Sequence, residues 1–332
     1  MSARPTALGR PLRIGTRGST LALWQAREVA RRLEAVGEAS EIVVIRTSGD
    51  RLGEAAHADT LLADGPGKRL FVKEIEDALL AGSIDLAVHS TKDLPVVLEP
   101  ELLMAAFLPR ATPWDALVLP LRHAAVPRTL EAVSAVLGPT RILGTSSIRR
   151  ITQLHRLLPG ATFEPIRGNV DTRLRKIDEG RYDAIVLACA GLERVGFGDR
   201  ISLALPVTAC VPAPGQGAVG VERRADAPEA LAACLAALDD ATTRAEVLAE
   251  RVVVEILEGG CQAPIGALAR AGADGTLELH AAVTSLDGDE LRALAFGTTG
   301  DPLALGRKVA AQLLADGAAD LLARSVVERG EA

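Results

Sequence analysis

The chain has 332 residues, of which 48% are hydrophobic and 24% are charged. That length allows two or three domains with separate cores, and the composition is ordinary for a soluble globular protein. The formal net charge of -6 argues against general affinity for nucleic acid. No apolar run reaches 18 residues and no signal-peptide pattern is present, so we expect a cytoplasmic protein without a membrane partner.

The amino-terminal part of the chain alternates between strand and helix patterns. Residues 12–16 are typical of a short strand, and Ser19 is a good N-cap for the helix that follows. Residues 42–45 predict a buried strand. Apolar residues recur in the helix at spacings of three and four, which predicts a core face: Ala22, Ala26, Val29, Leu33 and Val36.

Residues 48–69 are rich in Gly, Asp and Ala, show little periodicity and predict a mobile loop. A helix is predicted over 72–81 and a strand over 85–89. The strand delivers the segment Ser-Thr-Lys-Asp-Leu-Pro, residues 90–95, at its carboxyl end.

The second part of the chain repeats the first in outline. Residues 13–19 resemble residues 141–147, and residues 82–88 resemble residues 180–186. Strand–helix alternation in both copies predicts parallel sheets with right-handed crossovers. Two similar α/β lobes would leave a cleft, with ligands bound beyond the carboxyl ends of the strands.

The remaining segments predict how the lobes are connected. Residues 110–115 are typical of a hinge, residues 211–217 of a second crossing, and residues 218–222 of a strand that returns to the first lobe. A helix over 243–257, with Thr243 and Glu246 as a capping box, begins a smaller α+β part. We therefore expect a first lobe over 1–109 and 217–238, a second over 110–216, and a C-terminal domain over 239–332.

Arginines gather at the predicted carboxyl ends of strands. Guanidiniums that converge there need an anionic ligand, and their forks match carboxylates or phosphates. Helix amino-termini after residues 18–19 and 146–147 add further donors. Each arginine taken alone can also be a solvated helix-end charge. The set is Arg17, Arg149, Arg150, Arg167, Arg173 and Arg194.

One acid lies in this basic region. Asp93 follows Lys92 at the end of a predicted strand. The simpler interpretation is a turn residue before Pro95, where aspartate is common. The functional interpretation is a carboxylate that faces a cationic or N–H-bearing reactant, with its ionised form favoured by the neighbouring arginines.

One of the four cysteines stands apart. Cys189, Cys210 and Cys234 lie in runs of small apolar residues, where a thiol acts as a small hydrophobe. Cys261 lies in the segment Glu-Gly-Gly-Cys-Gln-Ala-Pro-Ile-Gly, residues 258–266, which predicts an exposed turn. A loop cysteine without a function fits that segment as well. No Cys-x-x-Cys pair is present, so we expect neither a zinc site nor a disulfide framework.

Taken together, several segments resemble the porphobilinogen deaminase family. They occur in the order of the family and cover nearly the whole chain: residues 16–26, 70–74, 89–95, 144–150, 167–170, 214–218 and 258–266. The resemblance implies two α/β lobes like those of periplasmic binding proteins around a cleft, with a smaller α+β C-terminal domain. It also implies a monomer.

The family is a transferase of tetrapyrrole and haem biosynthesis. Its members join four porphobilinogen units head to tail, release four ammonia molecules, and free the linear tetrapyrrole hydroxymethylbilane by hydrolysis. They carry a dipyrromethane cofactor, bound through a thioether to a loop cysteine. The resemblance makes Cys261 that cysteine, and it makes the sulfur an anchor rather than a nucleophile of each turnover.

The resemblance also implies roles for the other residues. Asp93 is the catalytic carboxylate, which helps ammonia leave and stabilises the azafulvenium cation. The six arginines bind acetate and propionate side chains, with Ser19, Lys92, Thr145 and Ser147 as polar helpers. Lys68 and Phe71 belong to a lid, where Arg69 departs from the glycine that the family often has.

Two other classes of function are weighed against this interpretation. A two-lobed anion-binding protein accounts for the arginines but leaves Asp93 and Cys261 unexplained. A cysteine-nucleophile acyltransferase needs a histidine base, and the histidines at 57, 89, 123, 155 and 280 fit no recognisable dyad spacing. Covalent pyrroles on the purified protein would separate the first interpretation from both.

Overall fold

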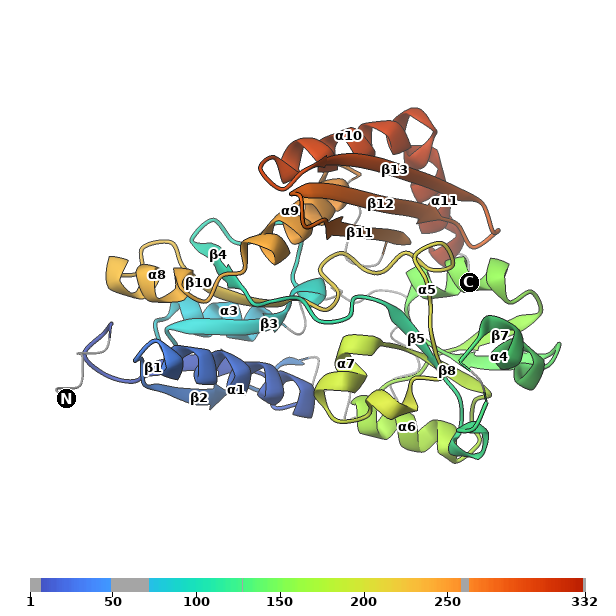
Figure 1. The fold of residues 1–332 in the computed structure, drawn as a ribbon, viewed down its shortest axis with the longest axis horizontal. Helices are drawn as coiled ribbons and strands as arrows, with labels where there is room; N and C mark the ends of the chain where they lie inside the picture. Colours follow the sequence, from blue (N-terminus) through green and yellow to red (C-terminus); the bar gives the residue numbers. More distant parts are fainter. Residues whose placement is uncertain (1–6, 49–71, 127, 258–262, 331–332) are drawn as a thin grey trace. The chain divides into compact units, whose positions relative to one another are not determined.

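Three β-sheets organise the part of the chain that the computed structural model describes, residues 7–48, 72–126, 128–257 and 263–330 (Figure 1). The chain divides into two compact units. Unit 1 includes the described residues up to Ala111 and resumes over Ala218–Arg244. Unit 2 includes Thr112–Gly217 and the chain from Ala245 onward, so the predicted second lobe and C-terminal domain fall in one unit. The division into three domains remains a prediction.

Unit 1 is built on a mixed five-stranded sheet in the order β2-β1-β3-β10-β4. β1 pairs in parallel with β2 and β3, whereas β10 is antiparallel to both β3 and β4. The prediction that residues 218–222 return to the first lobe is confirmed. The prediction of a parallel sheet is confirmed for β1, β2 and β3 but is wrong for β10, which is antiparallel to both of its neighbours. The elements are β1 (Leu12–Thr16), α1 (Thr20–Ala35), β2 (Ser40–Val44), α3 (Lys73–Leu80), β3 (Leu86–Ser90), the 3₁₀ turn η3 (Thr91–Asp93), β4 (Leu102–Phe107), β10 (Val219–Arg224) and α8 (Glu229–Ala236).

Helix α1 begins where the sequence predicts. The Ser19 hydroxyl accepts a hydrogen bond from the Ala22 amide at 3.3 Å, as an N-cap does. Ala26, Val29 and Leu33 are fully buried in the core, but Val36 lies beyond the helix end and is exposed. Strand β2 is an edge strand and no residue in it is buried, so the prediction of a buried strand at 42–45 is wrong.

Unit 2 repeats the topology of unit 1, with strands in the order β7-β6-β8-β5-β9. β6 pairs in parallel with β7 and β8, and β5 is antiparallel to β8 and β9. The elements are β5 (Asp115–Val118), η4 (Leu121–His123), α4 (Leu130–Leu137), β6 (Arg141–Gly144), α5 (Ile148–Leu157), β7 (Ala161–Glu164), α6 (Val170–Asp178), β8 (Ala184–Ala188), α7 (Cys189–Arg194), η5 (Gly198–Arg200) and β9 (Leu203–Ala204).

Equivalent hydrogen bonds mark the repeat. The Asp85 carboxylate accepts from the Arg13 amide, and the Asp183 carboxylate accepts from the Ile142 amide, each at 2.8 Å. The repeat predicted from sequence is therefore confirmed, but Arg13 corresponds to Ile142 rather than to Arg141. Strand pairing shows the same one-residue shift, because Gly15 pairs with Ala87 and Gly144 pairs with Ile185, each two residues after the aspartate.

The C-terminal part of unit 2 holds an antiparallel sheet in the order β11-β12-β13. Helix α10 contacts β12 and β13, and α11 contacts β12. None of the helices in the described part of the chain has the length and apolar content that crossing a bilayer requires. The elements are α9 (Ala241–Ile256), which begins at the end of unit 1, β11 (Ile265–Ala271), β12 (Thr276–Thr284), β13 (Glu290–Thr298), α10 (Pro302–Ala315) and α11 (Ala318–Gly330).

Helix α9 begins two residues earlier than the predicted capping box. The Asp240 carboxylate accepts from the Thr243 amide at 2.7 Å, so Asp240 occupies the capping position. Thr243 accepts instead from the Arg110 amide at 3.0 Å, and Glu246 accepts from the Ala271 amide at 3.0 Å. Both side chains of the expected capping box thus serve tertiary contacts.

Replacing Asp240 by alanine should lower the free energy of unfolding by about 0.5–2 kcal/mol, because the Thr243 amide loses its acceptor. Asp240→Asn keeps a side-chain oxygen and should retain most of the stability. Urea unfolding curves of the three proteins measure the difference. An unchanged midpoint in Asp240→Ala would show that the carboxylate does not stabilise the helix end.

Candidate active site

Unit 1 places four predicted site residues at one edge of its sheet. β1 and β3 are parallel neighbours, so their carboxyl ends meet at the same edge. Arg17 and Ser19 follow β1, and Lys92 and Asp93 lie in η3 directly after β3. All four side chains are partly exposed. A carboxylate, two cations and a hydroxyl therefore share an accessible edge.

Backbone and buried side-chain contacts fix the turn that carries Lys92 and Asp93. The Thr91 amide donates to the Ala218 carbonyl at 3.1 Å, and the Leu94 amide donates to the Thr91 carbonyl at 3.2 Å. The buried Gln25 of α1 donates through Nε2 to Ser90 Oγ at 2.8 Å. These contacts fix the backbone before and after Asp93, the candidate catalytic residue. Its position is therefore set by the segment that leads into β10 and by α1.

His89, the histidine at the end of a predicted strand, is buried beside Glu222. The two side chains lie 3.2 Å apart, with His89 Nε2 facing a Glu222 carboxylate oxygen. This contact gives His89 a structural partner inside the sheet.

Unit 2 places its predicted residues at the equivalent edge. Thr145 and Ser147 follow β6, Arg167 follows β7, and Arg194 ends the helix after β8. The Ser147 amide donates to Thr145 Oγ1 at 3.2 Å. Arg173, in the first turns of α6, donates to the Gly168 carbonyl at 2.7 Å, and Arg194 donates to the Gly217 carbonyl at 2.6 Å. Arg167, Arg173 and Arg194 are each partly exposed.

Arg149 and Arg150 differ from this group because they are buried and ion-paired. Arg149 Nη1 lies 2.8 Å from Asp115 Oδ2, and Arg150 Nη2 lies 2.7 Å from Asp115 Oδ1. The sequence pattern predicts that these arginines need an external anion. Asp115, which is fully buried, supplies part of that negative charge from within the fold. Their role in binding substrate carboxylates remains a prediction.

The charge state of Asp115 follows from its surroundings. Burial alone raises the pKa of a carboxyl group, but the charges of Arg149 and Arg150 outweigh burial and hold the pKa of Asp115 far below its usual value. Asp115 is therefore ionised at neutral pH. Two guanidiniums and one carboxylate leave the cluster with a net positive charge.

The two arginines use their donors differently. All three guanidinium nitrogens of Arg150 donate, to Asp115 and to the Val186 carbonyl. Among the described residues, Arg149 donates only through Nη1, to Asp115, Cys210 and the Val211 carbonyl. Nε and Nη2 of Arg149 thus keep donor capacity for an anionic ligand.

Three candidates lie outside the described residues: the predicted anchor Cys261 and the predicted lid residues Lys68 and Phe71. The other cysteines occupy the cores, as predicted. Cys189 and Cys210 are buried and Cys234 is partly buried. Burial raises the pKa of Cys189 and Cys210 to about 12 and that of Cys234 to about 11. Because a thiolate is the reactive form, these three thiols are unsuited to covalent attachment.

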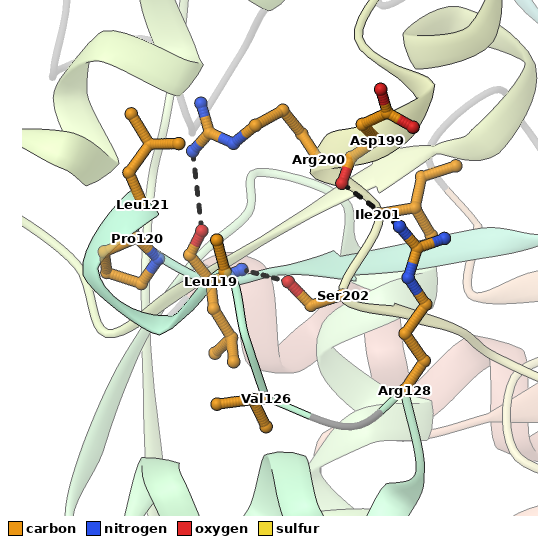
Figure 2. Close-up of a pocket in the computed structure, with 10 residues that line it drawn as sticks. Leu119, Pro120, Leu121, Val126, Arg128, Asp199, Arg200, Ile201 and Ser202 are labelled. Carbon is orange, nitrogen blue, oxygen red and sulfur yellow. Dashed lines mark hydrogen bonds between the residues drawn. The ribbon is translucent and has the colours of Figure 1, made fainter.

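A pocket in unit 2 contains none of the predicted residues (Figure 2). It is lined by Leu119, Pro120 and Ser202 together with two arginines. Arg200 pairs with Asp178 at 2.8 Å, and Arg128 donates to the Asp199 carbonyl at 3.3 Å. Asp178 offsets the charge of Arg200, and the lining residue Asp199 adds a carboxylate beside Arg128, so this pocket lacks the excess positive charge of the predicted site.

Sequence reasoning missed three residues that organise these edges: Asp115, Gln216 and Gln25. Gln216 lies within residues 214–218, one of the segments quoted above, and Gln25 lies within residues 16–26. The sequence therefore singled out the segments that contain Gln216 and Gln25, but it did not predict which residues these two side chains contact. For Asp115 the only local signal is an acid at the end of the predicted hinge.

Comparisons with known proteins identify the family of the chain. The family model "Porphobilinogen deaminase, dipyromethane cofactor binding domain" matches residues 12–232, and "Porphobilinogen deaminase, C-terminal domain" matches residues 244–315. A porphobilinogen deaminase of Desulforudis audaxviator is 48% identical over 95% of this chain and 98% of its own length. One of Syntrophobacter fumaroxidans is 45% identical over 94% of this chain and 97% of its own.

Among solved structures, an ancestral cationic amino acid solute binding protein is similar to 69% of this chain and 88% of its own, with 15% identity and a TM-score of 0.40. The two family models together span most of the sequence, and the curated relatives match it nearly from end to end. The chain therefore belongs to the porphobilinogen deaminase family.

Proposed function

We propose that this chain joins four porphobilinogen units head to tail, releases four ammonia molecules, and frees the linear tetrapyrrole hydroxymethylbilane by hydrolysis. It would thereby serve tetrapyrrole and haem biosynthesis. The observation that carries the proposal is the match of both family models, over residues 12–232 and 244–315. The edge of unit 1 supports it, because Asp93 lies there in the 3₁₀ turn η3 beside Lys92.

Asp93 is proposed as the catalytic carboxylate. When the C–N bond of the protonated aminomethyl group breaks, the electron pair leaves with ammonia and the substrate becomes a cation. An ionised carboxylate at the end of β3 stabilises that cation and accepts hydrogen bonds from pyrrole N–H groups. The free α-carbon of the growing chain then forms the new C–C bond and loses its proton.

The side chains present suit a dipyrromethane group, which carries acetate and propionate side chains. Arg17 in unit 1 and the arginines of unit 2 are donors for carboxylates, and Nε and Nη2 of Arg149 have no acceptor among the described residues. We propose Cys261 as the attachment residue. The bound dipyrromethane would supply the tethered end to which substrate units are added.

The proposed carboxylate contacts of Arg149 and Arg150 can be tested by leucine substitutions. Each lost charge-assisted hydrogen bond should cost roughly 1.5–3 kcal/mol, so both variants should bind porphobilinogen far more weakly or fail to load the cofactor. Michaelis constants and intact mass measure the two effects.

Arg10 provides a matched control because it also pairs with a carboxylate, Asp85, at 2.7 Å, in unit 1 before β1. Arg10→Leu should keep its affinity for porphobilinogen. Wild-type affinity in both Arg149→Leu and Arg150→Leu would show that neither side chain binds substrate carboxylates.

The whole function is tested by adding porphobilinogen to the purified protein. We expect one ammonia released for each unit consumed, a linear tetrapyrrole product, and an intact mass that exceeds the polypeptide by two pyrrole units. Substrate consumption without ammonia, or a polypeptide without added mass, would contradict the proposal.

We further propose that the chain acts as a monomer in the cytoplasm, and that Lys68 and Phe71 belong to a lid over the site. The family resemblance supports the monomeric state and the lid, and the proposed location rests on the sequence pattern, which has no apolar run of 18 residues. Light scattering during size-exclusion chromatography tests the first, and a mass of twice the chain would contradict it.

A further inference from the structure

Asp115 joins two arginines through the topology of unit 2. It is the first residue of β5, and β5 runs antiparallel to β8, so Asp115 pairs with Ala188 at the carboxyl end of β8. That position brings its carboxylate under the first turn of α5, which carries Arg149 and Arg150. Asp115 therefore lies behind the edge where the predicted substrate-binding residues are exposed.

The Asp115 carboxylate is saturated with donors. Oδ2 accepts from Arg149 Nη1 at 2.8 Å. Oδ1 accepts from Arg150 Nε at 2.9 Å, from Arg150 Nη2 at 2.7 Å and from Gln216 Nε2 at 3.0 Å. The Cys210 thiol lies 3.4 Å from Oδ2. Every one of these partners is buried, so the geometry is set inside the fold.

The segment that carries Gln216 is itself anchored. Gln216 Nε2 also donates to the Pro113 carbonyl at 2.7 Å, and the Gly215 amide donates to the buried Glu250 carboxylate at 2.6 Å. Helix α5 is tied to the same segment, because Gln153 accepts from the Val211 amide at 2.7 Å. The Asp115 carboxylate thus lies between two anchored elements, helix α5 and the segment that carries Gln216.

We propose that Asp115 is a positioning residue of the reaction, which orients the guanidinium of Arg149 through Nη1 and leaves Nε and Nη2 to bind a pyrrole carboxylate. The inference rests on the proposed function of Arg149. Without the negative charge of Asp115, two buried guanidiniums would repel each other and move apart. Gln216 assists by holding Oδ1 of the carboxylate.

Two substitutions separate charge from packing at this position. Asp115→Asn keeps the size and removes the charge, whereas Asp115→Glu keeps the charge and adds a methylene group. If Asp115 positions the arginines electrostatically, Asp115→Asn should raise KM for porphobilinogen about tenfold or more. The decrease in kcat should be smaller than the increase in KM. Alternatively, the intact mass should show that a smaller fraction of the protein carries the cofactor. Asp115→Glu should lie closer to wild type in both measurements.

Asp85→Asn is the matched control. Asp85 also pairs with two arginines, Arg10 and Arg13, and its side chain is mostly buried, but it precedes β3 at the amino end of the strand. The control should lose stability without a change in KM or loading. If Asp115→Asn behaves as Asp85→Asn does, or retains function better than Asp115→Glu, the positioning role is overturned and a packing role remains.

Gln216→Met covers the case in which Asp115→Asn does not fold. It removes one neutral donor from Oδ1 and should raise KM roughly two- to tenfold with the cofactor loaded. An unchanged KM in Gln216→Met would then overturn the proposal. Arg149→Leu separates the proposed carboxylate-binding role of Arg149 from the positioning role of Asp115. If this variant binds porphobilinogen normally, the carboxylate-binding role of Arg149 is contradicted. If only the Asp115 and Gln216 variants are normal, the positioning role alone fails.

Discussion

Asp93→Asn should nearly abolish the release of ammonia from porphobilinogen, by roughly 100-fold or more. The substitution keeps the size of the side chain and some hydrogen bonding but removes the negative charge that stabilises the substrate cation. The turn that carries Asp93 is held through Thr91, whose amide is bonded to the Ala218 carbonyl, so the backbone should not change. Ammonia release and intact mass should be followed together in single-turnover experiments.

Asp93→Glu is the control for charge, because the carboxylate survives with shifted geometry. It should retain more activity than Asp93→Asn. An Asp93→Asn protein that folds, carries cofactor and turns over near the wild-type rate would rule out the electrostatic role. In that case the aspartate would be a turn residue before Pro95, the simpler interpretation of the sequence.

Cys261→Ala should yield a folded protein that carries no covalent pyrrole and has no turnover. Thioether attachment requires a sulfur, and burial keeps the three described cysteines as thiols with a raised pKa. Intact mass of the purified variant, before and after addition of porphobilinogen, measures the effect. A wild-type cofactor mass on Cys261→Ala would assign the attachment to another residue.

The other cysteines provide the matched controls. Cys189→Ala, Cys210→Ala and Cys234→Ala should all retain the cofactor. Cys189 and Cys210 lie in the two hydrophobic clusters that flank the sheet of unit 2, so those substitutions should lower stability through small cavities. Loss of cofactor from one of them at unchanged stability would contradict the separation between core and anchor cysteines.

Local pattern was sufficient for much of the fold. Strand β1 and the cap of α1 by Ser19 were predictable because hydrophobic periodicity and capping act between residues close in the chain. The repeat was visible for the same reason, since each copy carries its own strand and helix signals. Asp93 was placed at the end of a strand correctly, because a strand delivers the next residues to its carboxyl edge.

Predictions of burial and capping were wrong where the outcome depends on residues far away in the sequence. The apolar pattern of residues 42–45 could not show that β2 is an edge strand with Val44 half exposed. The capping box at Thr243 and Glu246 had the right spacing, but Asp240 caps the helix and both side chains serve other segments. In each case the neighbours that decide burial or bonding come from elsewhere in the sequence.

The sequence by itself determined the family, the repeat, and the placement of the arginines and Asp93 after strands, because these follow from short segments read in order. Only the tertiary structure decided which arginines are exposed. Arg149 and Arg150 look like their neighbours in sequence, but Asp115 lies 34 and 35 positions away and meets them because β5 runs antiparallel to β8. Strand direction is a property of the whole sheet, so no local pattern could reveal that partner.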